Sequence, residues 1–239
     1  MIRKTAGSVG AGLPAIARVL SRASPLLHAT LCRLAVAVLM TALMAGCAAI
    51  RPKATPQPAF YALDSRPAAL APSPTRAAAV APTLLVNPSH AVSGFDSQRI
   101  VYVRSAHRLE YFAHSEWIDT PARMLTPLIV AAVEAGGAFR AVVPTPGAAA
   151  GELRLDTEIV RLEHDFIAQP SRARFTLRAY IVDTATRRVV ARREFDAVEP
   201  AASADPYGGV VAANRAVRTV LEQLVGFCAE TAASWRSGA

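Results

Sequence analysis

An apolar run near the N-terminus constrains this chain more than any other feature. Residues 34–44 read LAVAVLMTALM without a charge, and five basic residues but no acidic residue precede them. This run of 11 residues is shorter than the roughly 20 residues that a helix needs to span a bilayer. A basic lead, a short apolar core and small residues at its end have the form of a secretory signal. Residues 1–46 are therefore predicted to be a signal peptide.

The residues after this run indicate a lipid anchor. Ala45 and Gly46 are small, and Cys47 follows them. This order resembles a bacterial lipobox, in which cleavage before the cysteine accompanies acylation of its thiol. The alternatives are an ordinary signal peptide, or a buried apolar helix with an incidental cysteine. Ala48 rather than aspartate follows Cys47, which favours sorting to the outer membrane of a two-membrane bacterium.

Cleavage before Cys47 would change both the charge and the cysteine count. The formal net charge would fall from +8 to +3, because five basic residues leave. This weakens any nucleic-acid interpretation of the basic composition. Cys32 would leave with the signal, and Cys47 would be acylated. Cys228 would then have no intrachain partner, so the domain is predicted to hold no disulfide and to pack Cys228 in its core.

The remaining chain divides into a tether and one folded domain. Residues 47–82 hold seven of the 17 prolines, and the apolar island among them at 60–63 is predicted to be a short strand. Residues 65–82 are too rich in Pro and Ala to pack alone, so a mobile connection is expected there. Residues 83–236 have the length of a single domain.

Short strands around one helix are predicted between residues 83 and 143. The strands are expected at 83–86, 100–103, 109–112 and 139–143, with the second and third forming a hairpin. Thr120 before Pro121 predicts a helix start, and the glycines at 136 and 137 predict its end. Pro127 lies inside this helix, so a kink or a late start at Thr126 is expected.

The second half predicts three long strands and a helix. Apolar residues fall on odd positions from Leu153 and on even positions from Val160, which predicts a β-bulge near Ile159. Further strands are expected at 172–181 and 189–195, and a helix at 210–235. The predicted fold class is α+β, with a mostly antiparallel sheet and two helices packed on one face.

The sequence contains no familiar catalytic motif. G-x-S-x-G, P-loop, C-x-x-C and H-E-x-x-H patterns are all absent. His107, Glu110 and His114 are the nearest candidates for a metal or acid/base site, because on a helix they would share one face. Their surroundings are typical of a strand, where His107 and His114 point to opposite sides, so turn and strand-surface roles are favoured. His164 and Asp165 are interpreted as a solvated loop. The chain is therefore predicted to be non-enzymatic, with no metal and no cofactor.

Two surfaces are candidates for contact with other molecules. Arginines of equal parity on adjacent strands could meet an anionic surface or a partner: Arg172, Arg174, Arg178, Arg188 and Arg192. A turn near Ala185 would oppose Arg178 to Arg192, which is destabilising unless Asp156 and Glu158 neutralise the arginines. Aromatic residues in or beside the predicted hairpin are candidate partner anchors, or else core residues: Tyr102, Tyr111, Phe112 and Trp117.

Together these residues resemble a known family. The segment RIVYVRSAHRLEYFAHSEWID at 99–119, with LLV at 84–86, AGGAFRAVV at 135–143 and Tyr61-x-Leu63, is similar to the ABC-type transport auxiliary lipoprotein family. The resemblance implies an outer-membrane lipoprotein, facing the periplasm, in a paraquat-inducible or related intermembrane lipid transport system. It implies a periplasmic mammalian-cell-entry-type partner, leaves homo-oligomers open and supplies no catalytic residue. The alternative is a structural or adhesive envelope lipoprotein unconnected to transport.

Overall fold

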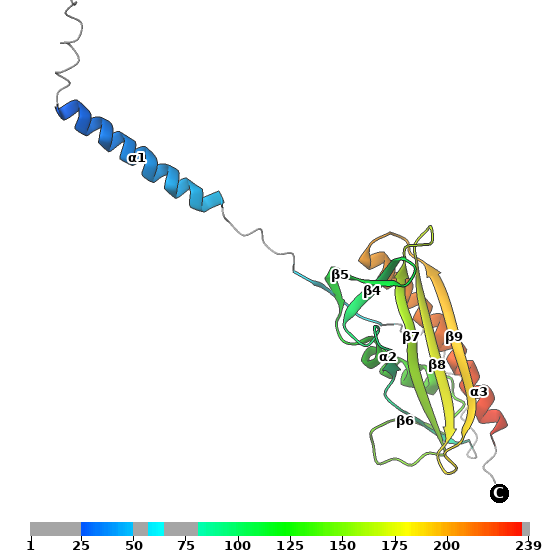
Figure 1. The fold of residues 1–239 in the computed structure, drawn as a ribbon. Helices are drawn as coiled ribbons and strands as arrows, with labels where there is room; N and C mark the ends of the chain where they lie inside the picture. The colour runs from blue at the N-terminus through cyan, green and yellow to red at the C-terminus, as the bar shows by residue number, and fades with distance from the viewer. Residues whose placement is uncertain (1–24, 50–56, 65–80, 236–239) are drawn as a thin grey trace, which may run out of the picture. The chain divides into compact units, whose positions relative to one another are not determined.

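The computed structural model describes residues 25–49, 57–64 and 81–235, which belong to two units (Figure 1). The first unit, Met1–Thr55, contains helix α1 (Pro25–Ala49). Among the described residues, no helix has both the length and the apolar character needed to cross a membrane. Most of the predicted connection at 65–82 lies outside the described residues, as does the side chain of Cys47 in the last turn of α1.

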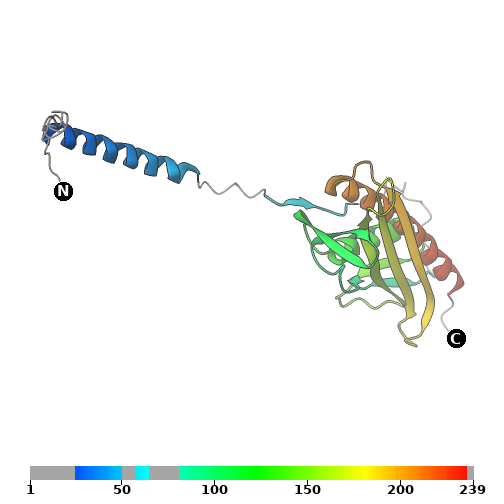
Figure 2. The same cartoon turned by 45° about the horizontal axis from the view of Figure 1, so that its top comes forward.

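The second unit, Pro56–Ala239, is an α+β domain (Figures 1 and 2). Its described residues form two helices, α2 (Pro121–Ala135) and α3 (Pro206–Ser234). They also form a nine-stranded sheet of β1 (Ala59–Tyr61), β2 (Thr83–Val86), β3 (His90–Ala91), β4 (Arg99–Ser105), β5 (Arg108–Trp117), β6 (Ala141–Pro144), β7 (Leu153–Asp165), β8 (Arg172–Asp183) and β9 (Val189–Pro200). The predicted α+β class is confirmed.

The sheet is mixed, so the expectation of a mostly antiparallel sheet was wrong. β1 pairs with β5 in parallel, β2 pairs with β6 and β7 in parallel, and β3 and β4 pair with β7 in parallel. The antiparallel pairs are β4–β5, β7–β8 and β8–β9. Neighbours joined by a short turn run antiparallel, whereas the short N-terminal strands reach their partners through longer connections that permit parallel pairing.

The long strands follow the predicted pattern closely. β7 and β8 pair antiparallel, and their register shifts between Ile159 and Arg161, which confirms the bulge. The shift keeps Leu155 before the bulge and Leu162 after it on the buried face. The bulge therefore lets one long strand bury apolar side chains along its whole length although their parity changes.

Helix α2 begins and ends where the sequence predicts. It follows Thr120 with Pro121 at its first position and ends before Gly136. Pro127 lies within the helix and does not delay its start, so the alternative start at Thr126 was wrong. A Cβ atom on Gly136 would lie 2.6 Å from Cγ1 of Val225 on α3, so the absent side chain lets α2 end against α3.

Helix α3 provides much of the core. Asp205 caps its start by accepting a hydrogen bond from the Gly208 amide at 2.7 Å, a cap the sequence analysis missed. The helix contacts β7, β8 and β9 and lies along the long strands in Figure 1. Cys228 is buried on it as predicted, and burial raises the pKa of its thiol to about 12. The thiol is therefore neutral and packs as a small apolar group.

Candidate functional site

The first candidate site is the outward face of β7, β8 and β9, which we call the charged face. Strand pairing places six arginines and six acidic residues on it: Arg154, Arg161, Arg172, Arg174, Arg178 and Arg192, with Asp156, Glu158, Glu163, Asp165, Glu194 and Asp196. The strip of arginines expected from β8 and β9 is therefore one part of a face with balanced charge. The acidic residues come from β7 and β9.

The register of β8 and β9 explains this balance. Arg178 lies opposite Glu194, and Arg192 lies opposite Tyr180, so the expected opposition of Arg178 and Arg192 was wrong. The pairing shifts between Ile181 and Val182, close to the turn. A turn position read from sequence cannot include that shift, and a change of register moves every cross-strand partner.

Ion pairs connect the charged face across all three strands. They join Arg154 to Asp156, Arg161 to Glu163, Arg172 to Asp165, Arg174 to Asp196, and Arg178 to both Glu158 and Glu194. Burial raises the pKa of Asp196, but hydrogen bonds from Arg174 and Thr176 outweigh it and hold the pKa below the usual value. Among the described residues, Arg188 and Arg192 form no ion pair, unlike the other three predicted arginines.

The second candidate site is the β4–β5 hairpin, which carries the four predicted aromatic anchors. Trp117 is 2% exposed and belongs to the core, so the core interpretation holds for this residue. Tyr102 and Phe112 are half-buried, and their ring centroids lie 4.5 Å apart. Tyr111 is exposed, with the Arg99 guanidinium 5.1 Å from its ring centroid. Tyr111 is therefore the aromatic residue of this hairpin that is most accessible to a partner.

Tyr102, Arg104 and Glu110 of the same hairpin contact one another. His107 occupies the turn with a φ of 65°, and His114 is exposed on β5. Glu110 accepts hydrogen bonds from Arg104 and from the Tyr102 hydroxyl, and the Arg104 hydrogen bond is the main cause that lowers its pKa. Within the described residues, no three metal-ligating side chains gather at one point.

His164 departs most from expectation. It was predicted in a solvated loop, but its side chain is buried at the end of β7, so that prediction was wrong. Its Nε2 lies 3.0 Å from the Ser171 hydroxyl, and its ring centroid lies 4.1 Å from that of Phe166. Among the described residues Nδ1 has no hydrogen-bond partner, and a Cβ atom on Gly209 would lie 2.3 Å from it. After the bulge, even positions of β7 face inward, and this signal could have placed His164 correctly.

Burial controls the charge of His164. Desolvation lowers the pKa of the imidazole, although Asp205 and Asp165 act in the opposite direction. Nε2 lies within hydrogen-bond distance of the Ser171 hydroxyl, and Nδ1 lies against the backbone of α3 at Gly209. A neutral imidazole fits this site. The ring therefore holds the end of β7 against the start of α3 as an uncharged core residue.

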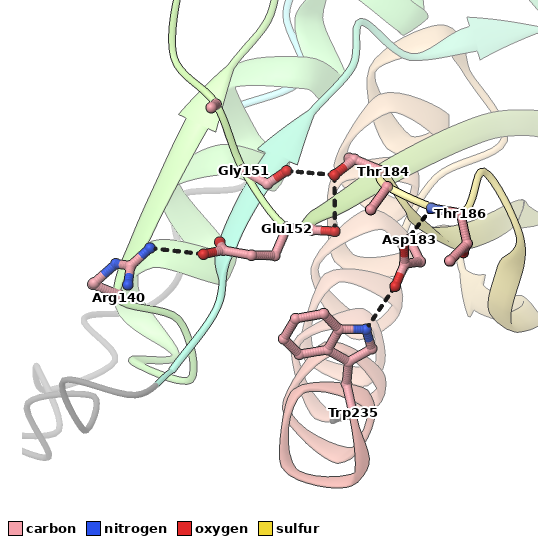
Figure 3. A pocket seen from close by; sticks show the side chains of 9 residues that line it. Arg140, Gly151, Glu152, Asp183, Thr184, Thr186 and Trp235 are labelled. Atoms are coloured by element: carbon pink, nitrogen blue, oxygen red, sulfur yellow. Dashed lines mark hydrogen bonds and ion pairs between the residues drawn. The ribbon is translucent and has the colours of Figure 1, made fainter. Parts of the chain in front are cut away.

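The third candidate site is a pocket of about 460 Å³ at the other end of β7 (Figure 3). Its lining comes from separate segments: Arg140, Ala150, Gly151, Glu152, Asp183, Thr184, Ala185, Thr186 and Trp235. No local pattern links these segments, so sequence reasoning missed the pocket.

The polar groups of this pocket are paired with one another (Figure 3). Arg140 lies 3.0 Å from the Glu152 carboxylate, and the Trp235 indole donates to Asp183 at 3.3 Å. The Thr184 hydroxyl donates to the Gly151 carbonyl at 2.6 Å. A hydrogen bond from the Thr83 amide is the main cause that lowers the pKa of Glu152. The charged residues that line the pocket, Arg140, Glu152 and Asp183, thus all have partners.

Comparison with known proteins gives a consistent match. A model of the family described as ABC-type transport auxiliary lipoprotein component matches residues 61–225. The solved structure of protein XCC0632 from Xanthomonas campestris, of the DUF330 family, is similar to this chain with 28% identity and a TM-score of 0.63. The match covers 72% of this chain and 95% of XCC0632. A second solved structure, of an uncharacterized protein, is 10% identical and has a TM-score of 0.55. The match covers 72% of this chain and 99% of that protein, and it shows that the two share the fold. No curated protein matches the sequence.

The charged face predicts an asymmetric response to charge reversal. Arg178→Glu should lower the melting temperature, because it places a third carboxylate beside Glu158 and Glu194. Arg192→Glu, which breaks no ion pair between described residues, is the control and should leave the melting temperature unchanged. Thermal unfolding at low and high salt measures both variants, and salt should reduce the effect of Arg178→Glu. Equal melting temperatures for the two variants would contradict the pairing.

Buried His164 predicts a pH-dependent stability. The imidazole of the unfolded chain titrates at about pH 6.5, and the folded-state pKa is lower. Between these values the unfolded state binds the proton, so stability is complete above about pH 6.5 and is lost as the pH falls below it. His164→Gln cannot titrate and should flatten this part of the profile. Denaturant unfolding between pH 5 and pH 8 measures both proteins, and parallel profiles would refute the assignment.

Proposed function

Because the chain belongs to the family of ABC-type transport auxiliary lipoprotein components, we propose that it is a non-enzymatic auxiliary subunit of an intermembrane lipid transport system. The observation that carries the proposal is the family match, which extends from β1 into α3. The transported cargo would be phospholipid or another apolar molecule. On this proposal the protein contributes an anchored docking domain to a machine whose energy comes from the ABC transporter.

The anchor in this proposal is an acylated Cys47 in the outer membrane. Residues 1–46 would be the signal peptide, residues 47–82 the lipidated tether and residues 83–236 the family domain. Two or three acyl chains bury enough methylene groups, at about 0.8 kcal/mol each, to hold a protein on a bilayer stably. The domain would then face the periplasm and need no membrane-spanning segment of its own. The matched residues begin at Tyr61, after the predicted acylation site, which supports this arrangement.

The partner in this proposal is a periplasmic mammalian-cell-entry-type protein. We take α2 and α3 to cover one face of the sheet, which leaves the charged face and the β4–β5 hairpin for contact. The hairpin is better suited to bind a protein than the charged face, because Leu109 and Tyr111 are exposed on it. Large aromatic residues often dominate the energy of protein binding. A hollow of about 380 Å³ beside Tyr111, lined by Arg99, Phe112, Ala113 and Glu116, could receive a partner side chain. Most charges of the charged face are already paired within the domain.

Removal of the acylated thiol tests the anchor. Cys47→Ser should leave an uncleaved or mislocalised precursor with a folded domain, because Cys47 precedes every residue of the sheet. Cys32→Ser is the matched control, since it lies in the same helix and should not alter localisation. Membrane fractionation and acyl labelling measure the outcome. Normal outer-membrane fractionation of Cys47→Ser with its acyl label retained would exclude the lipoprotein assignment.

Copurification tests the partner. A pulldown from detergent-solubilised envelope should recover a mammalian-cell-entry-type protein, and Tyr111→Ala should reduce the recovery. A central aromatic anchor contributes about 2 kcal/mol or more, so a loss of about 30-fold in affinity is expected. Tyr207→Ala is the control, because Tyr207 is also exposed but lies on α3. Recovery of envelope proteins without any transporter component would instead support the structural or adhesive alternative.

A further inference from the structure

The turn between β8 and β9 is a second surface with a chemistry of its own. We call residues 183–193 the β8–β9 tip; residues 185–190 are six consecutive exposed positions. The turn projects from the end of the long strands in Figures 1 and 2. The strand register places it at the opposite end of β7 from the β4–β5 hairpin, because Asp183 pairs with Leu153, whereas Val103 pairs with Asp165.

Positive charge predominates on the β8–β9 tip, which holds four arginines and one aspartate. Among the described residues, Arg187, Arg188 and Arg192 form no ion pair. The acidic groups of neighbouring elements pair with other arginines: Glu152 with Arg140, Glu194 with Arg178, and Glu230 with Arg193. Asp183, within the tip itself, accepts hydrogen bonds from the Thr186 amide and the Trp235 indole. In the part of the chain that the structure describes, three guanidinium groups therefore lack an ion-pair partner at one end of a domain whose charged face is otherwise paired.

Apolar side chains lie between these arginines. Val189 is 56% exposed and Val190 is 43% exposed, and both lie on the edge strand β9. Arg187 and Arg188 precede the two valines, and Arg192 follows them. Exposed branched aliphatic residues flanked by free guanidinium groups combine an apolar contact with an anion-binding contact in one short segment.

The shape of the β8–β9 tip is held by its own hydrogen bonds. The Asp183 amide donates to the Arg188 carbonyl at 2.9 Å, and the Arg187 amide donates to the Asp183 carbonyl at 2.8 Å. The Asp183 carboxylate accepts from the Thr186 amide at 2.8 Å. Arg187 has a φ of 59°, a left-handed conformation that favours glycine or asparagine over arginine. The turn therefore presents its basic residues in a defined geometry.

We propose that the β8–β9 tip binds the surface of a membrane that contains anionic phospholipids. Guanidinium groups bind phosphate with two parallel hydrogen bonds, and the two valines can enter the region between headgroups and acyl chains. Each basic residue near an anionic leaflet strengthens binding by about fivefold. The end of one hairpin is narrow, whereas a stable protein interface covers about 800 Å² on each partner. A membrane needs no such matching surface, so it fits the tip better than an acidic protein.

This contact goes beyond the proposed transport role and does not depend on it. The tip uses neither Cys47 nor the β4–β5 hairpin. Loss of the transporter partner would leave the tip chemistry intact, and loss of the tip contact would leave copurification intact. The two proposals can therefore fail separately.

Photocrosslinking in vesicles tests the proposal on the full chain. The photoreactive residue p-benzoylphenylalanine replaces Val190, and the purified protein is reconstituted in vesicles of phosphatidylcholine alone or with phosphatidylglycerol. Irradiation should yield lipid adducts, seen by intact mass, mainly in the vesicles with phosphatidylglycerol. The matched position is Val198, an exposed valine toward the other end of the same strand, and it should yield few adducts.

Charge reversal provides the second measurement. Arg188→Glu with Arg192→Glu should lower the adduct yield at Val190 by about 25-fold or more, at about fivefold for each residue. Arg108→Glu with Arg123→Glu is the charge-matched control, because both arginines are highly exposed and lie away from the tip. High salt should lower the yield of the unreversed protein in the same direction.

Three outcomes would overturn the proposal. One is the absence of lipid adducts at position 190 in a protein whose circular dichroism shows a native fold. Another is equal yields in neutral and anionic vesicles, which would remove the role of the arginines. The third outcome comes from irradiating cells that carry the same photoreactive residue at position 190. Adducts to a protein and none to lipid would make the tip a protein-docking surface instead.

Discussion

The packing of α3 against the inward face of β7, β8 and β9 is the interaction on which the rest of the domain depends. Phe175, Leu177 and Ile181 are fully buried on β8, and Phe195 on β9 lies 5.8 Å from Phe227 of α3, measured between ring centroids. Full burial of one such side chain contributes about 1.5–3 kcal/mol. The long strands and the helix therefore stabilise each other, and neither could hide its apolar face alone.

This packing decides what the opposite face of the long strands can be. Alternation along a strand sends every second side chain outward, so burial of the odd positions of β8 exposes Arg174 and Arg178. These side chains are neutralised by carboxylates from β7 and β9. Ion pairs of this kind stabilise a protein little, but they leave the face without a strong net charge. Free positive charge remains where the strands end, at the β8–β9 tip.

Sequence patterns predicted the single elements well. The β4–β5 hairpin, the bulge after Ile159, the start of α2 at Pro121 and the burial of Cys228 are all confirmed. Each of these depends on residues close together in the chain. The prediction for His164 was wrong because it considered the following loop, whereas the parity of β7 and the backbone of α3 decide the environment of the ring.

Residues close together in the chain were enough to predict the properties that local chemistry sets: the signal-like run, the periodicity of each strand and helix, and the family resemblance. Three features depend on how distant segments pack: the direction of the short strands, the register that places Glu194 rather than Arg192 opposite Arg178, and the pairing of the pocket charges. The physical reason is that a period of two residues shows which side chains share a face. It does not show which strand lies beside them, and charges are neutralised by neighbours in space.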